Sequence, residues 1–139
     1  MTRAAHIALA MTGASGAPYG LALLERLVAA GCRVSLMISR PAQVVLGMET
    51  DLGLPGRSKD IERFFSERLK AGDGQIAVYG REQWTAPVAS GSAAPDAMVV
   101  CPCTTATASA LATGASRSRT SQAASRPQSR LPASTSARR

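Results

Sequence analysis

The sequence predicts an α/β protein built on an open, mainly parallel sheet with helices on both faces. Short apolar runs, typical of strands that are buried on both faces, alternate with segments of helical periodicity. The first apolar run leads through a glycine-rich turn into a helix, as in a strand–helix–strand unit. A chain of 139 residues is enough for one domain and too short for two, so we expect one core and one site.

The first half of the chain contains one such unit and the start of a second. Residues 6–11 are predicted to form a short apolar strand that ends at the glycine-rich turn. We expect a helix from Pro18 to Gly31, because proline is tolerated in a first helical turn, leucines recur at helical spacing and glycine ends the run. Residues 33–39 are predicted to form the second strand, and Pro41 opens a short helix.

The second half of the chain continues this alternation. Ser58 is predicted to cap a helix that runs through Leu69. Two more strands are expected at residues 76–79 and 96–101, and a helix of small residues follows the last strand as far as Gly114. Four strands with intervening helices indicate a flavodoxin-like or Rossmann-like sheet, which we expect to be incomplete at its C-terminal side.

The positive charge of the chain is confined to its end. The formal net charge is +7, yet residues 1–114 carry ten Lys and Arg against nine Asp and Glu, whereas residues 115–139 carry six Arg and no acidic residue. The charge therefore does not indicate a nucleic-acid-binding face on the folded body, and we expect no nucleic-acid partner. We predict an α/β domain at residues 1–114 and a tail at residues 115–139 that cannot form a core.

Cysteine and histidine usage argues against a metal site. Cys32, Cys101 and Cys103 lie in apolar surroundings, and we expect reduced, mostly buried thiols. The segment Cys101-Pro102-Cys103 lacks the two-residue spacer of redox and zinc motifs, and His6 is the only histidine. The apolar stretch near the first residue is too short for a signal sequence, so we expect a cytoplasmic protein that does not enter a membrane.

The turn after the first strand, Gly13-Ala14-Ser15-Gly16, is the first candidate binding element. A loop between a buried strand and a helix offers backbone N–H groups, here a serine hydroxyl, and the positive end of a helix dipole, which together suit an anion or the edge of a flavin. Glycine allows a tight turn and the close approach of a ligand. The spacing differs from the dinucleotide-binding fingerprint, so a tight connection without a ligand is the alternative.

Hydroxyl side chains follow two other predicted strands where those strands end. Ser39 ends the second strand, and Thr104, Thr105 and Thr107 come just after the last one. Because the carboxyl ends of parallel strands meet along the same edge of a sheet, these hydroxyls are expected to converge on a phosphate or a ribityl chain. The alternative for each hydroxyl taken singly is a helix cap.

Five separated segments resemble, in order and spacing, the UbiX-type flavin prenyltransferases. They are residues 11–20 (MTGASGAPYG), 49–51 (ETD), 84–87 (WTAP), 89–92 (ASGS) and 101–107 (CPCTTAT). The resemblance covers roughly residues 4–114. The broader flavoprotein family also contains flavin-dependent cysteine decarboxylases, but their catalytic histidine and Pro-x-Met-Asn segment do not occur in this sequence.

This resemblance implies an enzyme that joins a dimethylallyl group from dimethylallyl phosphate to reduced FMN without a metal. The product, prenylated FMN, would serve as the cofactor of a UbiD-type decarboxylase, as in ubiquinone biosynthesis. The resemblance also implies a homo-oligomer, which is a dodecamer in the family.

The resemblance further assigns roles to individual residues. The residues that match FMN-binding positions are Gly13, Ala14, Ser15, Ser39, Thr104, Thr105, Ala106 and Thr107. Trp84 would stabilise a cation-like allyl group through its π cloud. Glu49 would stabilise charge or transfer a proton at the flavin nitrogen, and Ser15 would belong to a proton relay. Ala89 and Ser90 would line the prenyl pocket. A single core aromatic and a solvated helix-end glutamate are the alternatives for Trp84 and Glu49.

Two positions depart from the pattern of many relatives. Thr104 stands where they have serine, which keeps the hydroxyl, and Ala106 stands where they have glycine, so that its methyl group would crowd the ligand.

The resemblance stops close to the point where the composition changes. After Gly114 relatives continue with an Asn-rich turn, a helix, a Lys-Glu-Arg-like segment, a strand and an Arg-Glu-x-Pro motif, none of which follows here. We therefore expect a flavin prenyltransferase sequence that is truncated or frameshifted after about residue 115 and inactive without the groups that hold the substrate phosphate. The alternative is a non-catalytic flavin-binding fragment whose basic tail contacts RNA through its phosphates.

Overall fold

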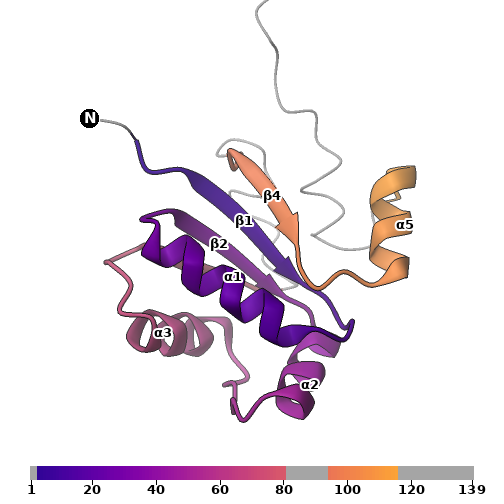
Figure 1. The fold of residues 1–139 in the computed structure, drawn as a ribbon, viewed down its shortest axis with the longest axis horizontal. Helices are drawn as coiled ribbons and strands as arrows, with labels where there is room; N and C mark the ends of the chain where they lie inside the picture. Colours follow the sequence, from indigo (N-terminus) through magenta and orange to yellow (C-terminus); the bar gives the residue numbers. More distant parts are fainter. Residues whose placement is uncertain (1–2, 81–93, 116–139) are drawn as a thin grey trace, which may run out of the picture.

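Parallel strands form a four-stranded sheet in the computed structural model, which describes residues 3–80 and 94–115. The strands are β1 (His6–Met11), β2 (Arg33–Ile38), β3 (Ile76–Tyr79) and β4 (Ala97–Val100). The helices are α1 (Ala17–Ala29), α2 (Arg40–Glu49), α3 (Ser58–Arg68) and α5 (Thr105–Thr113). The strands lie in the order β3-β2-β1-β4 and all pairs are parallel, so the predicted open, flavodoxin-like α/β sheet is confirmed (Figure 1).

The strand order reverses at β1, which lies between β2 and β4. Leu9 in the middle of β1 is opposite Leu36 of β2 on one side and Val99 of β4 on the other. The chain runs from β1 outward through β2 to β3 and then returns to the other side of β1. In open parallel sheets, ligands bind beyond the carboxyl ends of the strands at such a reversal. The loop that follows β1, at residues 13–16, lies at this position.

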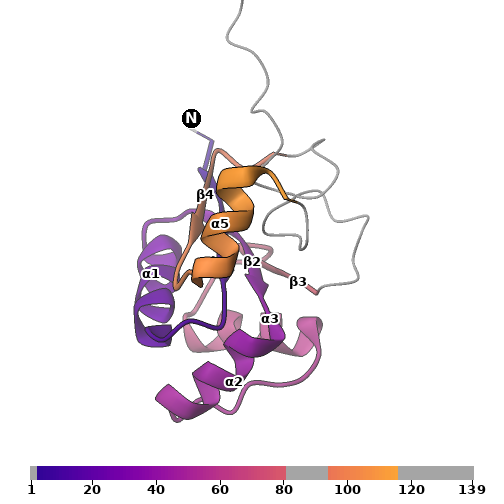
Figure 2. The same cartoon turned by 90° about the vertical axis from the view of Figure 1, so that its right-hand side faces the viewer.

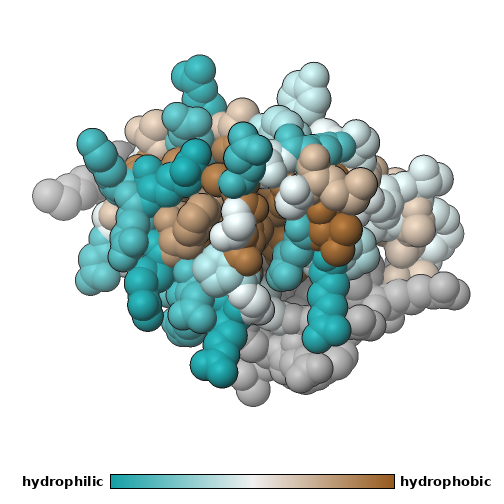
Figure 3. Space-filling view, turned by 90° about the horizontal axis from the view of Figure 1, so that it is seen from below, coloured by the Kyte–Doolittle hydropathy of each residue, from teal (hydrophilic) through white to brown (hydrophobic). Residues whose placement is uncertain are grey.

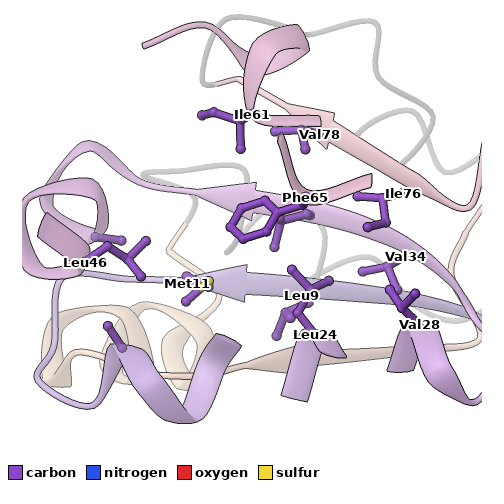
Figure 4. Close-up of a cluster of buried hydrophobic side chains, with 13 residues drawn as sticks. Leu9, Met11, Leu24, Val28, Val34, Leu46, Ile61, Phe65, Ile76 and Val78 are labelled. Carbon is purple, nitrogen blue, oxygen red and sulfur yellow. The ribbon is translucent and has the colours of Figure 1, made fainter. Parts of the chain in front are cut away.

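The larger core cluster lies on the face of the sheet that α1 and α3 cover. Alternate residues of each strand point to this face. The buried members of the cluster are Leu9, Met11, Ala17, Leu24, Val28, Val34, Leu36, Ala42, Leu46, Ile61, Phe65, Ile76 and Val78. Figure 4 shows Leu9 of β1 and Leu24 of α1 close together, with Phe65 of α3 on the same side of the strands. Burial of a large apolar side chain contributes about 1.5–3 kcal/mol, so these contacts hold the helices against the sheet.

The opposite face of the sheet carries a smaller buried cluster, formed by Ala8, Ala10 and Met37. α5 lies past the end of β4 and away from α1 (Figures 1 and 2), and none of its residues is buried. The residues of β4 alternate between exposed and half-buried, whereas five of the six residues of β1 are buried. β4 and α5 are therefore much less covered than the elements around β1.

Most of the predicted boundaries lie within two residues of the observed ones, but one predicted helix cap is wrong. α1 has Pro18 in its first turn, and α5 ends at Gly114, whose φ of 69° is left-handed. Ser58, the predicted cap of α3, is instead its first residue, because Arg57 is the N-cap and accepts hydrogen bonds through its backbone carbonyl. No side chain caps this helix, but the negative charge of Asp60 in its first turn interacts favourably with the helix dipole and so stabilises the N-terminus.

Large apolar side chains of α1 and α2 are exposed to solvent. Tyr19 is 76% exposed, Val44 62% and Met48 80%. Val44 and Met48 are four residues apart and therefore lie on one side of α2. Figure 3 shows apolar side chains that reach the surface among hydrophilic ones on the face seen from below. α2 thus presents an apolar stripe to solvent.

His6 and Ser35 form a buried polar pair between β1 and β2. The Nε2 atom of His6 and the Oγ atom of Ser35 are 2.7 Å apart, and the two residues are only 6% and 3% exposed. Burial, with the positive charge of Arg33 as the next cause, lowers the pKa of His6 below its ordinary value. The imidazole is therefore neutral at pH 7, and each of the two side chains supplies the hydrogen-bond partner of the other.

We expect the Ser35→Ala substitution to lower the free energy of unfolding by about 1–3 kcal/mol, because it leaves a buried imidazole nitrogen without a partner. Urea unfolding followed by circular dichroism measures this change. The control is Ser58→Ala, which removes a hydroxyl that caps no helix and should change stability by less than about 0.5 kcal/mol. Equal effects of the two substitutions would show that the buried pair contributes nothing specific.

Candidate functional site

The candidate site lies at the carboxyl end of β1, where the loop of residues 13–16 leads into α1. Gly16 is the N-cap of α1 and has a left-handed φ of 105°, a conformation that glycine adopts without strain. Gly13 is required for a different reason, since a Cβ atom at this position would lie 2.4 Å from the Cβ atom of Pro41 in α2. Gly13 therefore permits the close approach of α2, whereas the sequence predicted that its role is to admit a ligand.

The carboxylate of Glu49 binds this loop from the end of α2. Its Oε1 atom accepts a hydrogen bond of 2.5 Å from the hydroxyl of Ser15. Its Oε2 atom accepts hydrogen bonds from the backbone N–H groups of Gly16, at 3.0 Å, and Ala17, at 2.9 Å. The structure thus brings together Ser15 and Glu49, two of the three predicted catalytic residues, although they lie 34 positions apart in the sequence.

The contacts of Glu49 favour its charged form. Its hydrogen bond from Ser15, followed by those from the N–H groups of Ala17 and Gly16, lowers the pKa of this carboxyl below its ordinary value. The carboxylate also lies at the N-terminus of α1, where the helix dipole favours a negative charge. The loop therefore binds an oxyanion through two backbone N–H groups and a hydroxyl, which is the set of donors that the sequence predicted for it.

Thr12 connects the loop after β1 with the loop after β4. Its hydroxyl donates to the carbonyl of Pro102 at 2.7 Å and accepts from the N–H of Thr104 at 2.8 Å. Its own N–H donates to the carbonyl of Pro102 at 3.1 Å, and the residue is only 6% exposed. No role was predicted for Thr12 from the sequence. Like Ser39 and Thr104, it is a hydroxyl residue at the end of a strand, and this position is the signal that could have identified it.

The predicted hydroxyls at the other strand ends cap helices in this structure. Ser39 is the N-cap of α2, and its hydroxyl accepts from the N–H of Ala42 at 3.2 Å. Thr104 is the N-cap of α5, and its hydroxyl accepts from the N–H of Thr107 at 3.2 Å. The two threonine hydroxyls are also 2.9 Å apart. The N-termini of α1, α2 and α5 therefore follow three neighbouring strands at the same edge of the sheet.

The remaining positions that were predicted to bind FMN lie in the loop after β1 and in the first turn of α5. Ala14 is half-buried beside Ser15, and Thr105 and Ala106 are exposed in the first turn of α5. Trp84, Ala89 and Ser90 lie outside the described residues, as does the tail from residue 116 onward.

Residues 3–80 and 94–115 hold no cluster of three or more His, Cys, Asp or Glu side chains that is arranged to bind a metal ion. Across the same ranges, the helices are too short or too polar to cross a membrane.

Comparison with known proteins identifies relatives along most of the chain. The model of the family described as Flavoprotein matches residues 1–132. A flavin prenyltransferase, UbiX of Pseudomonas aeruginosa, is 54% identical over 110 residues, which are 79% of this chain and 53% of that protein. The UbiX flavin prenyltransferase of Methanothermobacter thermautotrophicus is 40% identical over 109 residues, which are 78% of this chain and 49% of that protein.

Solved structures share the fold of this chain. A crystal structure of a UbiX protein in complex with FMN and dimethylallyl pyrophosphate is similar with a TM-score of 0.68 and 30% identity, over 87% of this chain and 58% of that one. A dodecameric FMN-dependent UbiX-like decarboxylase from Escherichia coli O157:H7 is similar with a TM-score of 0.66 and 28% identity, over 86% of this chain and 58% of that one. The chain thus spans about half the length of the curated relatives that it matches.

We expect Glu49 to remain ionised at a lower pH than an ordinary glutamate. Its contacts with the loop contribute stability that is present at neutral pH and is lost only as the pH falls through the lowered pKa, below the ordinary value of 4.5. A carbon NMR titration of the Glu49 carboxyl group measures this pKa. Ser15→Ala should shift the titration back toward the ordinary value, and Ser66→Ala, a serine change on α3, should leave it in place. An unchanged titration in Ser15→Ala would contradict the proposed cause.

Proposed function

The chain belongs to the Flavoprotein family, and on that basis we propose that it is the FMN-binding part of a flavin prenyltransferase. The reaction joins a dimethylallyl group from dimethylallyl phosphate to reduced FMN and gives prenylated FMN. The identity of 54% to a flavin prenyltransferase supports this choice within the family. The single observation that carries the proposal is the contact of Ser15 with Glu49 at the carboxyl end of β1.

The donors of the site suit a flavin nucleotide. The N-terminal amides of α1 bind the carboxylate of Glu49, and this contact supports the proposal that the loop is suited to oxyanions. The first turn of α5 adds the hydroxyls of Thr104, Thr105 and Thr107 along the same edge of the sheet. Hydroxyls and backbone amides are the groups that bind phosphate and ribityl oxygens without a metal. The FMN-binding residues in the proposal are Gly13, Ala14, Ser15, Ser39, Thr104, Thr105, Ala106 and Thr107.

Glu49 and Ser15 are proposed to transfer protons at the flavin. Bound FMN supplies an electron-rich ring as the acceptor of the dimethylallyl group. The carboxylate of Glu49 is negative at neutral pH and is hydrogen-bonded to the hydroxyl of Ser15, so that the two side chains form one path for a proton beside the ligand. Ser15 passes a proton without carrying net charge itself, which suits a position between a carboxylate and a ligand.

Three further residues enter the proposal from the family resemblance alone. Trp84 stabilises positive charge on the allyl group through its π cloud, and Ala89 and Ser90 line the prenyl pocket. Their positions fall outside the described residues.

The proposed partners follow from the relatives. Dimethylallyl phosphate as donor is supported by the structure of a UbiX protein that contains FMN and dimethylallyl pyrophosphate. A homo-oligomer is supported by the dodecameric UbiX-like protein and by the exposed apolar stripe of Val44 and Met48 on α2. We further propose that the product serves a UbiD-type decarboxylase in ubiquinone biosynthesis, and that the protein acts in the cytoplasm without a metal.

Binding of FMN and transfer of the dimethylallyl group require different parts of the fold in this proposal. The described residues contain the loop after β1 and the start of α5, whereas the relatives are about twice as long as the matched segment. We propose that residues 1–114 bind FMN, and that transfer of the allyl group requires groups from the second half of the fold.

We expect reduced FMN to bind the 139-residue protein, and the Glu49→Gln substitution to weaken this binding several-fold, because an amide cannot accept hydrogen bonds from all three donors of the loop. Anaerobic absorbance titration measures the affinity. Glu67→Gln, which makes the same chemical change on α3, is the matched control and should bind as the parent does. Failure of the parent protein to bind FMN would overturn the proposed function.

The transfer step is tested separately by mass spectrometry of the flavin. The protein is mixed with reduced FMN and dimethylallyl phosphate, either alone or extended by the unmatched half of the Pseudomonas aeruginosa relative. Prenylated FMN is expected only with the extended form. An adduct formed by the 139-residue protein alone would show that the second half is not needed.

A further inference from the structure

Thr12 is a buried hydroxyl residue that the proposed reaction does not use. It follows β1 directly and is only 6% exposed. A threonine hydroxyl has one proton to donate and an oxygen that accepts. Here the proton goes to the carbonyl of Pro102 at 2.7 Å, and the oxygen accepts from the N–H of Thr104 at 2.8 Å. The protein itself therefore engages both functions of this hydroxyl, so Thr12 acts on the loop after β4 and not on a ligand.

The bond from Thr104 to Thr12 fixes the N-cap of α5. The backbone of Thr104 is extended, with φ of −70° and ψ of 152°, so it lies outside the hydrogen-bonded helix. Its hydroxyl accepts from the N–H of Thr107 at 3.2 Å and thereby joins the cap to the first turn. A continuous path of hydrogen bonds thus leads from the end of the buried strand β1, through Thr12 and Thr104, to the start of α5.

The start of α5 holds donors whose direction depends on this cap. The hydroxyl of Thr104 donates to that of Thr107 at 2.9 Å, so the O–H of Thr107 remains to donate elsewhere. The N–H groups of Thr105 and Ala106, in the first turn, have no acceptor within the helix. All three residues are among the FMN-binding positions of the proposal. A shift of the cap would move these donors together.

Helix α1 limits the space that is available to the same loop. A Cβ atom at Gly20 in α1 would lie 2.6 Å from the carbonyl oxygen of Cys101 and 3.3 Å from the Cδ atom of Pro102. The helix therefore lies directly against the loop after β4. None of the residues of α5 is buried, so packing contributes little to the position of this helix. The hydrogen bonds of Thr12 are for this reason the main contacts that orient its N-terminus in the described part of the chain.

We propose that Thr12 is a positioning residue for FMN binding. Its hydroxyl holds the N-cap residue Thr104 and thereby directs the donors at the start of α5 toward the ligand. Thr12 itself does not touch the flavin. The inference rests on the proposed function, because FMN is the ligand concerned, whereas the contact with the cap is tested without any flavin.

Two substitutions at Thr12 in the 139-residue protein separate its hydroxyl from its shape. Thr12→Val keeps the shape and the backbone N–H that donates to Pro102, but it leaves the N–H of Thr104 without a partner. Thr12→Ser keeps the hydroxyl. We expect Thr12→Val to weaken the binding of reduced FMN at least about fivefold and Thr12→Ser to bind within about twofold of the parent. Anaerobic absorbance titration measures both affinities.

A matched control separates positioning from general stability. Ser35→Ala also removes a buried, hydrogen-bonded hydroxyl, but this one lies within β2 and contacts His6. It should lower the free energy of unfolding and still bind FMN as the parent does. If Thr12→Val does not fold, Thr12→Cys takes its place in the comparison with Thr12→Ser, because a thiol is a much weaker donor and acceptor than a hydroxyl of nearly the same size.

Amide hydrogen exchange without flavin tests the contact with the cap. Exchange at Thr104 and Thr107 should be at least about tenfold faster in Thr12→Val than in the parent, and unchanged in Thr12→Ser.

Three outcomes would overturn the inference: parent-like FMN binding by Thr12→Val, equally weak binding by Thr12→Ser or by Ser35→Ala, or unchanged exchange at Thr104 in Thr12→Val. In each of these the parent still binds FMN, so the proposed function stands. Failure of the parent to bind FMN would instead overturn the proposed function and the role of Thr12 in binding together, and the exchange rates would still decide whether Thr12 holds the cap.

Discussion

The position of β1 between β2 and β4 is the constraint on which the rest of the described structure depends. Because the sheet extends in both directions from β1, the loops after all three strands meet at its carboxyl end. Thr12, the residue after β1, binds the loop that follows β4 through the carbonyl of Pro102. The N–H of Ser39, after β2, donates to the carbonyl of Met11. The candidate site is therefore built on the most buried strand, which gives its loops a rigid base.

Glu49 adds a second connection, this time between helices. Its carboxylate joins the end of α2 to the beginning of α1, and the close contact of Gly13 with Pro41 draws the same two elements together. The hydrogen bonds that position the carboxylate also hold its pKa below the ordinary value and favour its charged form. The same hydrogen bonds therefore connect the two helices and favour the charge of the Glu49 carboxylate.

The two edges of the sheet differ in the part of the chain that the structure describes. At β3, Glu62 closes the edge and completes the packing of α3. At the opposite edge, the residues of β4 alternate between exposed and half-buried, and none of the residues of α5 is buried. In the proposal, the FMN contacts come from the loops beside β1.

The sequence by itself determined the parallel α/β architecture, its four described strands and the loop of residues 13–16, because buried strands, helices and glycine turns each leave a local pattern of apolar and small residues. The family resemblance named Ser15 and Glu49 as catalytic residues, and the structure showed that they are in contact. Only the tertiary structure decided that Arg57, and not Ser58, is the N-cap of α3, that Gly13 makes room for Pro41 and that Thr12 joins two loops. It also decided that, among the described residues, β4 pairs with β1 alone. These features depend on contacts between residues far apart in the chain, and no local pattern encodes such distances.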